Sequence, residues 1–170
     1  MNNGFDFDRM VERHNSDSLK WHKYQGRDVI PMWVADMDFQ APEPILEALR
    51  ARVAHGVFGY AVPSKELAQV VVERMAKMYK WRIEPSWIVW LPGVVSALNI
   101  VCRAFGDDGE DVLTFSPIYP PFLSAPPLSR KNVQTIPLDR YDGSYVMAPD
   151  RFEREITPQS RILLLCNPHN

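Results

Sequence analysis

The sequence lacks most of the features that mark secreted, membrane-spanning or nucleic-acid-binding proteins. It has only two cysteines, Cys102 and Cys166, both within apolar runs, so we expect buried thiols in a reducing compartment rather than a disulfide framework. No apolar run approaches the roughly 20 residues that a membrane-spanning helix needs. The net charge is -2 and basic residues are dispersed, which argues against nucleic acid or a membrane surface as a partner.

The beginning of the sequence also lacks the pattern of a secretory signal. Residues 1–8 are polar and acidic, without the basic and apolar regions of a signal peptide. Together with the two isolated cysteines, this predicts a cytoplasmic protein. With 170 residues and 46% apolar side chains, the chain can bury a sizeable core, as one domain or one domain with an appendage.

Common catalytic and metal-binding motifs are absent as well. The sequence contains no phosphate-binding P-loop and no Ser-centred nucleophile elbow. The four histidines show no metal-ligand spacing. Asp36 and Asp38 could suggest a carboxylate pair or a metal site. Two acids are too few ligands for a metal, however, and Asp is favoured in turns, so we expect a turn and no metal.

What the sequence does contain is an alternation of strand-like and helix-like segments. Short continuous apolar runs predict strands, and apolar residues at helical spacing predict helices. Pro42, Pro44 and Gly56 bracket one expected helix, and Ser64 is the expected N-cap of the next. Strands are expected at 88–91, 111–115, 133–138 and 161–166. Further helices are expected at 94–105, after the prolines of 117–121, and at 149–156.

This alternation predicts an α/β fold. Continuous apolar strands that alternate with helices are typical of a mainly parallel sheet with helices on both faces. The segment before residue 44 holds few periodic stretches and is expected to form an arm rather than part of the sheet.

Three loops at the expected carboxyl end of the sheet carry groups that could bind a ligand. The turn at Gly93 opens a helix, whose free N–H groups and dipole form an anion site, although any α/β protein has such turns. Tyr119 could stack on a planar ring, or could pack under its proline-rich loop. Asn170 could donate to a phenolate oxygen, or could belong to an ordinary turn. Together the three loops would suit a phosphorylated aromatic cofactor.

Four short motifs occur in a characteristic order over nearly the whole chain. They are Asp-Met-Asp-Phe at 36–39, His-Gly-Val-Phe-Gly-Tyr at 55–60, Ser-Pro-x-Tyr at 116–119 and Asn-Pro-x-Asn at 167–170. This order resembles the fold-type I aminotransferase superfamily of pyridoxal-phosphate (PLP) enzymes. More narrowly, the first two motifs resemble the MalY/PatB-type cystathionine β-lyases, a branch of C–S lyases.

The resemblance implies a role for each motif. The PLP phosphate would be bound by backbone amides of Gly93, Val94 and Val95. Tyr119 would stack on the pyridine ring, and Asn170 would bond the ring's phenolic oxygen. Tyr60 would reach the phosphate of the other subunit's cofactor, in a homodimer with shared active sites. The segment that would border the entrance for the amino-acid substrate is Asp36, Met37, Asp38 and Phe39.

The resemblance also implies groups that these residues do not supply. The family needs an Asp facing the pyridine nitrogen, a Schiff-base Lys and an Arg for the substrate carboxylate, all normally after the Asn-Pro-x-Asn motif. None of the six lysines stands in the Schiff-base context, so we assign no catalytic residue and expect the 170-residue chain alone to be inactive. Residues 1–44 would be the N-terminal arm and small-domain segment. Residues 45–170 would be the truncated N-terminal part of the PLP-binding major domain.

Three functions stay open. The resemblance favours a PLP-dependent C–S β-lyase acting on cystathionine or related cysteine S-conjugates, which would release thiol, pyruvate and ammonia. A PLP-dependent class I/II aminotransferase on the same scaffold is the second. The third is a non-catalytic N-terminal fragment or interaction module, which would expose a sheet edge and an apolar face.

Overall fold

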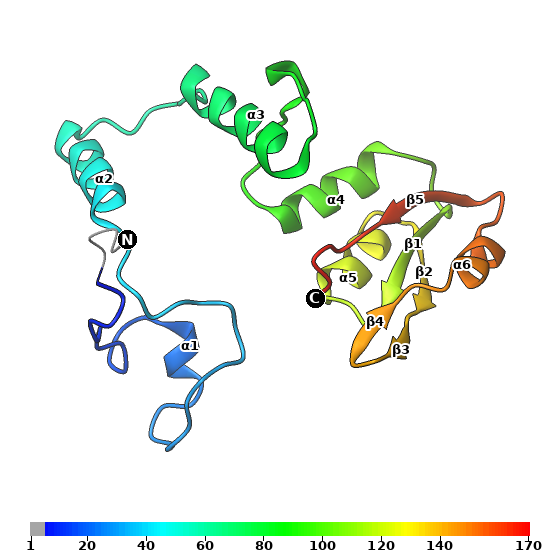
Figure 1. The fold of residues 1–170 in the computed structure, drawn as a ribbon, viewed down its shortest axis with the longest axis horizontal. Helices are drawn as coiled ribbons and strands as arrows, with labels where there is room; N and C mark the ends of the chain where they lie inside the picture. Colours follow the sequence, from blue (N-terminus) through cyan, green and yellow to red (C-terminus); the bar gives the residue numbers. More distant parts are fainter. Residues whose placement is uncertain (1–5) are drawn as a thin grey trace. The chain divides into compact units, whose positions relative to one another are not determined.

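The computed structural model describes residues 6–170, which form two compact units (Figure 1). The first unit extends to Val62, and the second runs from Pro63 to Asn170. The predicted division after residue 44 concerns the domains of a complete enzyme and stays a prediction. Among residues 6–170, no helix combines the length and the apolar character that crossing a membrane requires.

The first unit contains two helices, α1 (Leu19–His22) and α2 (Glu43–His55), within otherwise irregular chain. As predicted, α2 begins beside Pro42 and Pro44. It ends at Gly56, whose left-handed backbone (φ 74°) is a conformation that favours glycine. None of the residues of α2 is buried, so apolar packing contributes little to holding this helix in place.

A cluster of ion pairs holds the irregular segments of the first unit. The guanidinium of Arg13 lies 2.8 Å from Asp36 Oδ2 and 2.7 Å from Asp38 Oδ1. The buried Lys20 places its Nζ 2.6 Å from Asp38 Oδ2 and donates to the Asp36 carbonyl oxygen at 2.7 Å. The Trp21 indole N–H donates to Asp38 Oδ1 at 2.8 Å. The chain around α1 is thereby tied to the Asp-Met-Asp-Phe turn.

These contacts favour the ionised form of both carboxyl groups. The hydrogen bond from Lys20, followed by that from Trp21, lowers the pKa of Asp38 from 3.8 to about 2. The hydrogen bond from Arg13 lowers the pKa of Asp36. Both carboxylates are about one-third exposed, so solvent screens part of the attraction. Near neutral pH the cluster therefore contains two carboxylates and two cations in direct contact.

Helices and strands alternate through the second unit, as predicted. Ser64 caps its first helix, since its side-chain oxygen accepts a hydrogen bond from the Leu67 N–H at 3.1 Å. The elements in chain order are α3 (Lys65–Tyr79), the 3₁₀ turn η1 (Pro85–Trp87), α4 (Val94–Ala104), β1 (Asp111–Ser116), α5 (Pro121–Leu128), β2 (Asn132–Pro137), β3 (Asp139–Tyr141), β4 (Ser144–Val146), α6 (Pro149–Glu155) and β5 (Ser160–Leu164).

A three-stranded parallel sheet forms the centre of the second unit. The strand order is β2-β1-β5, and β1 pairs in parallel with both neighbours. In register, Val112 lies beside Val133 on β2 and Ile162 on β5. The buried Thr114 adds a side-chain bond, since its Oγ1 donates to the Leu164 carbonyl oxygen at 3.0 Å. Strands β3 and β4 form a separate antiparallel hairpin.

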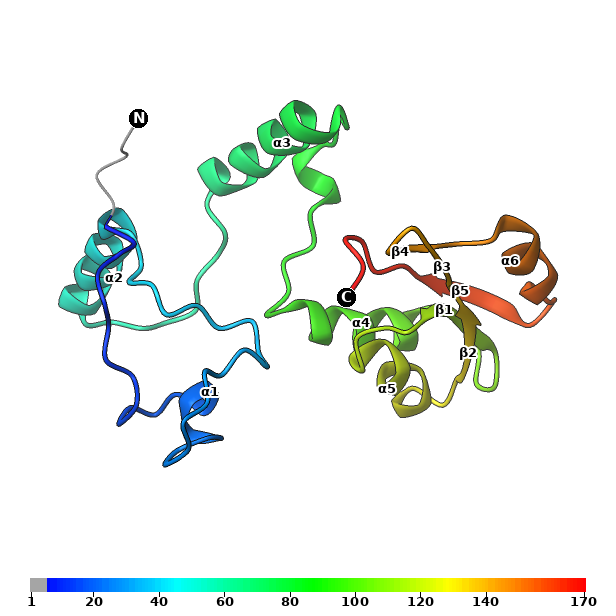
Figure 2. The same ribbon diagram turned by 60° about the horizontal axis from the view of Figure 1, so that its bottom comes forward.

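Helices cover both faces of this sheet. Successive side chains of β1 point to opposite faces, as a strand requires. Val112 packs against α4 and α5 in one cluster, whereas Leu113 and Phe115 belong to a second cluster. Phe152 of α6 packs on the second cluster, with its ring 5.8 Å from that of Phe115. Figure 2 shows α4 and α5 on one side of the sheet and α6 on the other. The predicted α/β architecture is confirmed.

One predicted strand is wrong. Residues 88–91 form no strand and pair with no strand among the described residues, and Val89 is 77% exposed. The outer strands of the described sheet, β2 and β5, each have an unpaired edge, but this segment forms no ladder with either of them. An apolar run becomes a strand only where a partner offers backbone hydrogen bonds. The residues before this segment instead form the short turn η1.

The two cysteines are both free, as predicted, but differ in burial. Cys102 of α4 is completely buried between helix and sheet, and burial raises the pKa of its thiol. Cys166 is only partly buried, because it follows the end of β5 and lies outside the sheet. The expectation of a buried thiol is therefore confirmed for Cys102 and wrong for Cys166.

Replacing Lys20 with Met should raise the pKa of Asp38 toward 3.8, because the hydrogen bond that lowers this pKa most is lost. In the wild type, the ionised carboxylate of Asp38 stabilises the fold. This contribution to stability is fully present above pH 3.8 and is lost as the pH falls through about 2. NMR titration of the Asp38 carboxyl carbon measures the shift. Acid unfolding followed by circular dichroism should begin at higher pH in the variant.

Lys65→Met is the matched control for this prediction, since Lys65 is exposed at the start of α3. It should leave both the Asp38 titration and the acid transition unchanged. An Asp38 pKa that stays near 2 in the Lys20→Met variant would contradict the assigned role of Lys20.

Candidate functional site

The loops that follow β1 and β5 form an open pocket in the second unit. Because the two strands are parallel neighbours, both loops leave the sheet at the same edge. The pocket has a volume of about 400 Å³. Its lining residues are Pro117, Ile118, Tyr119, Pro120, Tyr145, His169 and Asn170. Two residues that the sequence singled out, Tyr119 and Asn170, are therefore brought to one place.

Direct hydrogen bonds join the two loops. The Tyr119 backbone N–H donates to the Asn170 carbonyl oxygen at 2.7 Å. The Nε2 atom of His169 lies 2.6 Å from the Pro117 carbonyl oxygen. Both loops also contain a cis peptide bond before proline, Ser116–Pro117 and Asn167–Pro168. The aromatic ring and the terminal amide are thus presented by two segments that hold each other.

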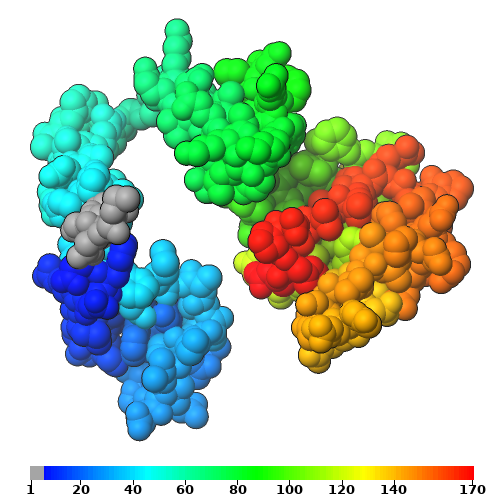
Figure 3. Space-filling view, in the orientation of Figure 1, coloured from blue at the N-terminus to red at the C-terminus, as the bar shows by residue number. Residues whose placement is uncertain are grey.

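The β3–β4 hairpin supplies a further wall of the pocket. Tyr145 of β4 lies beside His169, with ring centroids 5.7 Å apart and planes tilted by 55°. Figure 3 shows the last residues of the chain, in red, lying against the hairpin in orange. Sequence reasoning missed both Tyr145 and His169. Tyr145 belongs to none of the four motifs, and His169 occupies the variable position of Asn-Pro-x-Asn.

The turn predicted to bind an anion lies at the N-terminus of α4. Gly93 precedes the helix, and its carbonyl oxygen accepts the helical bond from Ala97 N–H at 3.0 Å. The first N–H groups of a helix have no partner within it and point outward. Apart from Gly93 and its two chain neighbours, no heavy atom of the described residues lies within 4 Å of the position that a Cβ on Gly93 would take. Val94, the first residue of α4, is 74% exposed.

This helix terminus belongs to the same unit as the pocket, although Gly93, Val94 and Val95 are not among the residues that line it. Figures 1 and 2 both show the start of α4 on the side of the unit where the chain reaches Asn170. The three predicted cofactor contacts therefore lie within one compact unit, and their roles toward a cofactor stay predictions.

The predicted substrate segment, Asp36 to Phe39, lies in the first unit. Both of its carboxylates are engaged by Arg13 and Lys20, and the Met37 carbonyl oxygen accepts from the Arg13 guanidinium at 3.0 Å. No group of acidic, His or Cys residues in the described part of the chain could hold a metal ion. The place of this segment at a substrate entrance stays a prediction.

Tyr60, the predicted contact to a second subunit, also lies in the first unit and is completely exposed. The segment before it is fixed by Arg52, which donates to the Val57 carbonyl oxygen at 2.7 Å. The Arg52 guanidinium also lies over the ring of Phe58, 5.6 Å from its centroid. Tyr60 thus follows an anchored segment, and its contact with a second subunit stays a prediction.

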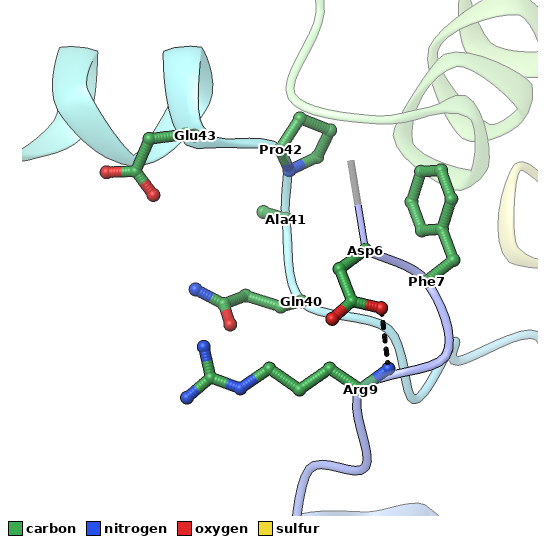
Figure 4. A pocket seen from close by; sticks show the side chains of 7 residues that line it. All are labelled: Asp6, Phe7, Arg9, Gln40, Ala41, Pro42 and Glu43. Carbon is green, nitrogen blue, oxygen red and sulfur yellow. Dashed lines mark hydrogen bonds between the residues drawn. The ribbon is translucent and has the colours of Figure 1, made fainter. Parts of the chain in front are cut away.

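A smaller hollow of about 170 Å³ lies in the first unit, between its N-terminal segment and the start of α2 (Figure 4). Asp6 accepts the backbone N–H of Arg9 at 3.1 Å, which makes a local turn. The side chains of Arg9, Gln40 and Glu43 extend to one side of the hollow (Figure 4). No predicted site residue lines it, and its polar groups are typical of a solvated surface.

Comparisons with known proteins agree with the motifs. No family model matches the chain. Cystathionine beta-lyase PatB from Bacillus subtilis (strain 168) is 38% identical over 169 residues, which cover 96% of this chain and 44% of PatB. The chain thus spans less than half the length of this relative.

Solved structures give the same result for the fold. The crystal structure of OvoB matches with a TM-score of 0.90 and 46% identity, over 98% of this chain and 44% of the OvoB chain. Cystalysin from Treponema denticola, which contains a pyridoxal 5'-phosphate cofactor, matches with a TM-score of 0.88 and 31% identity, over the same shares. The chain is therefore related over nearly its whole length to MalY/PatB-type cystathionine β-lyases, and its fold is that of part of a fold-type I PLP enzyme.

Proposed function

We propose that the complete protein containing this chain is a PLP-dependent C–S β-lyase. It would act on cystathionine or related cysteine S-conjugates and release thiol, pyruvate and ammonia. The observation that carries the proposal is the pocket in which Tyr119 and Asn170 meet, at the carboxyl edge of a parallel sheet related to that of PatB. PLP, when bound, supplies an electron sink for the carbanion that forms when the substrate loses its α-proton.

The residues present fit this cofactor. Tyr119 is 42% exposed and lines the pocket, so its ring would be accessible for stacking on a pyridine ring. The side-chain amide of Asn170 lines the same pocket and can donate to a phenolic oxygen. The open space at Gly93 and the free N–H groups of Val94 and Val95 suit a phosphate.

We propose that the Schiff-base lysine lies in a further part of the complete protein, which corresponds to the region of the relatives that this chain does not cover. No lysine lines the pocket among the described residues. Lys20 and Lys131 are buried and engaged, Lys131 by donating to the Asp107 carbonyl oxygen at 2.8 Å. The remaining lysines are exposed on helices or turns, at Lys23, Lys65, Lys77 and Lys80.

Exposed apolar residues beside the sheet support a longer protein. β5 is one of the two outer strands of the sheet in the described residues, with one edge unpaired. Leu163 and Leu165 are 46% and 63% exposed. An apolar edge of this kind is typical of a surface that further protein covers. A further covering segment agrees with the length of PatB, which is more than twice that of this chain.

A homodimer with shared active sites is part of the proposal, and Tyr60 would complete the phosphate site of the other subunit. The exposure of Tyr60 and the anchoring of its segment by Arg52 support this role. We further propose a cytoplasmic enzyme, on the evidence of two free cysteines, with no nucleic-acid or membrane partner.

The reaction itself distinguishes the lyase from an aminotransferase. With cystathionine and PLP, the complete protein should release pyruvate and thiol in equal amounts, because β-elimination yields one of each per turnover. Pyruvate can be followed with lactate dehydrogenase and NADH, and thiol with a disulfide reagent. Transfer of the amino group to an added oxo acid, without pyruvate from cystathionine, would support the aminotransferase instead.

Tyr119→Ala in the complete protein should weaken PLP binding about tenfold, because the stacking contact is lost. Tyr119→Phe keeps the ring and is the matched control, with a dissociation constant close to that of the wild type. Fluorescence titration of the apo protein with PLP measures both. Unchanged cofactor occupancy in the Ala variant would remove Tyr119 from the site.

Tyr60→Phe should weaken cofactor binding only if the site is shared, because its hydroxyl would serve the other subunit's phosphate. Mixing this variant with subunits that lack the Schiff-base lysine should restore activity, since one site of each mixed dimer is then complete. Activity that stays at the level of the separate variants would argue against shared sites.

A further inference from the structure

His169 forms a second connection between the two pocket loops, beside the bond that joins their backbones. Its Nε2 lies 2.6 Å from the carbonyl oxygen of Pro117, two residues before Tyr119. It is itself the residue before Asn170. A carbonyl oxygen only accepts, so Nε2 must carry the proton and donate.

Two bonds constrain the loops in a way that one bond does not. The bond from Tyr119 N–H to the Asn170 carbonyl oxygen fixes one point of contact, about which the loops can still pivot. The bond from His169 to Pro117 adds a second point and restricts that rotation. The backbone segments that carry Tyr119 and Asn170 then keep one relative orientation.

Tyr145 completes the arrangement from a third segment. Its ring lies beside the imidazole at 5.7 Å and comes from the β3–β4 hairpin, which belongs to neither loop. The imidazole is thus held between the Pro117 carbonyl and an aromatic side chain. His169 is nevertheless exposed, so its bond competes with water and adds little to the stability of the whole fold.

We propose that His169 is a positioning residue for the cofactor. It would tie the loop that carries Tyr119 to the loop that carries Asn170, with Tyr145 fixing the imidazole plane. The inference rests on the proposed PLP function and goes beyond it, because it assigns a role to the variable position of the Asn-Pro-x-Asn motif. His169 acts on the cofactor only through its two neighbours.

Two variants of the complete protein separate the hydrogen bond from the bulk of the side chain. His169→Leu removes the donor and puts an apolar side chain of comparable size in its place. His169→Gln keeps an N–H donor at nearly the position of Nε2. His22→Leu, at an exposed histidine of α1, is the control for loss of a surface imidazole.

Three measurements are made on each variant. The dissociation constant for PLP comes from titration of the apo protein, and the orientation of bound PLP from its visible circular dichroism per bound cofactor. The thermal unfolding midpoint of the apo protein reports general structural damage. His169→Leu should bind PLP about three- to tenfold more weakly, the range for loss of one neutral hydrogen bond. It should also show a reduced dichroic signal with an unchanged midpoint.

Recovery of the affinity and the dichroic signal in His169→Gln, with wild-type behaviour of His22→Leu, completes the expected result. A His169→Leu protein with wild-type affinity and dichroism would overturn the inference, and so would a loss of affinity matched by a lower unfolding midpoint. A wild-type protein that takes up no PLP would overturn the proposed function and this inference together. PLP uptake that is indifferent to His169 would overturn this inference alone.

Discussion

The parallel pairing of β1 with both β2 and β5 is the constraint on which the second unit depends. Parallel neighbours cannot be joined by a tight turn, so the chain must cross over a face of the sheet between them. α5 and α6 lie in these crossovers and bury the two faces of β1. The same pairing makes β1 and β5 end at one edge. Tyr119 and Asn170 meet there although 50 residues separate them in the sequence.

Elements with local signals could be predicted, and elements that depend on distant partners could not. Proline and glycine positions bound α2, and the hydroxyl of Ser64 caps α3, because these effects act within a few residues. The segment 88–91 has the apolar run of a strand but no strand beside it. The four residues of such a run do not show whether a partner strand will lie beside it.

The same distinction applies to the candidate site. Tyr119 and Asn170 could be placed together because each follows a recognisable strand of a parallel sheet. Tyr145 could not, since a hairpin between β2 and α6 has no fixed direction until it packs. The contacts of Arg13 and Lys20 to the Asp36–Asp38 turn span 16 to 25 residues with no periodic spacing, so no sequence pattern predicted them.

Those contacts also limit the chemistry that the Asp-Met-Asp-Phe turn can perform. A carboxylate held by Arg13 or Lys20, with its pKa lowered, is a poor proton acceptor near neutral pH and is already neutralised as a metal ligand. Met37 and Phe39 are instead 77% and 56% exposed. If this turn borders the substrate entrance, it would contact substrate through these apolar side chains. The two aspartates would then determine the shape of the turn rather than the reaction.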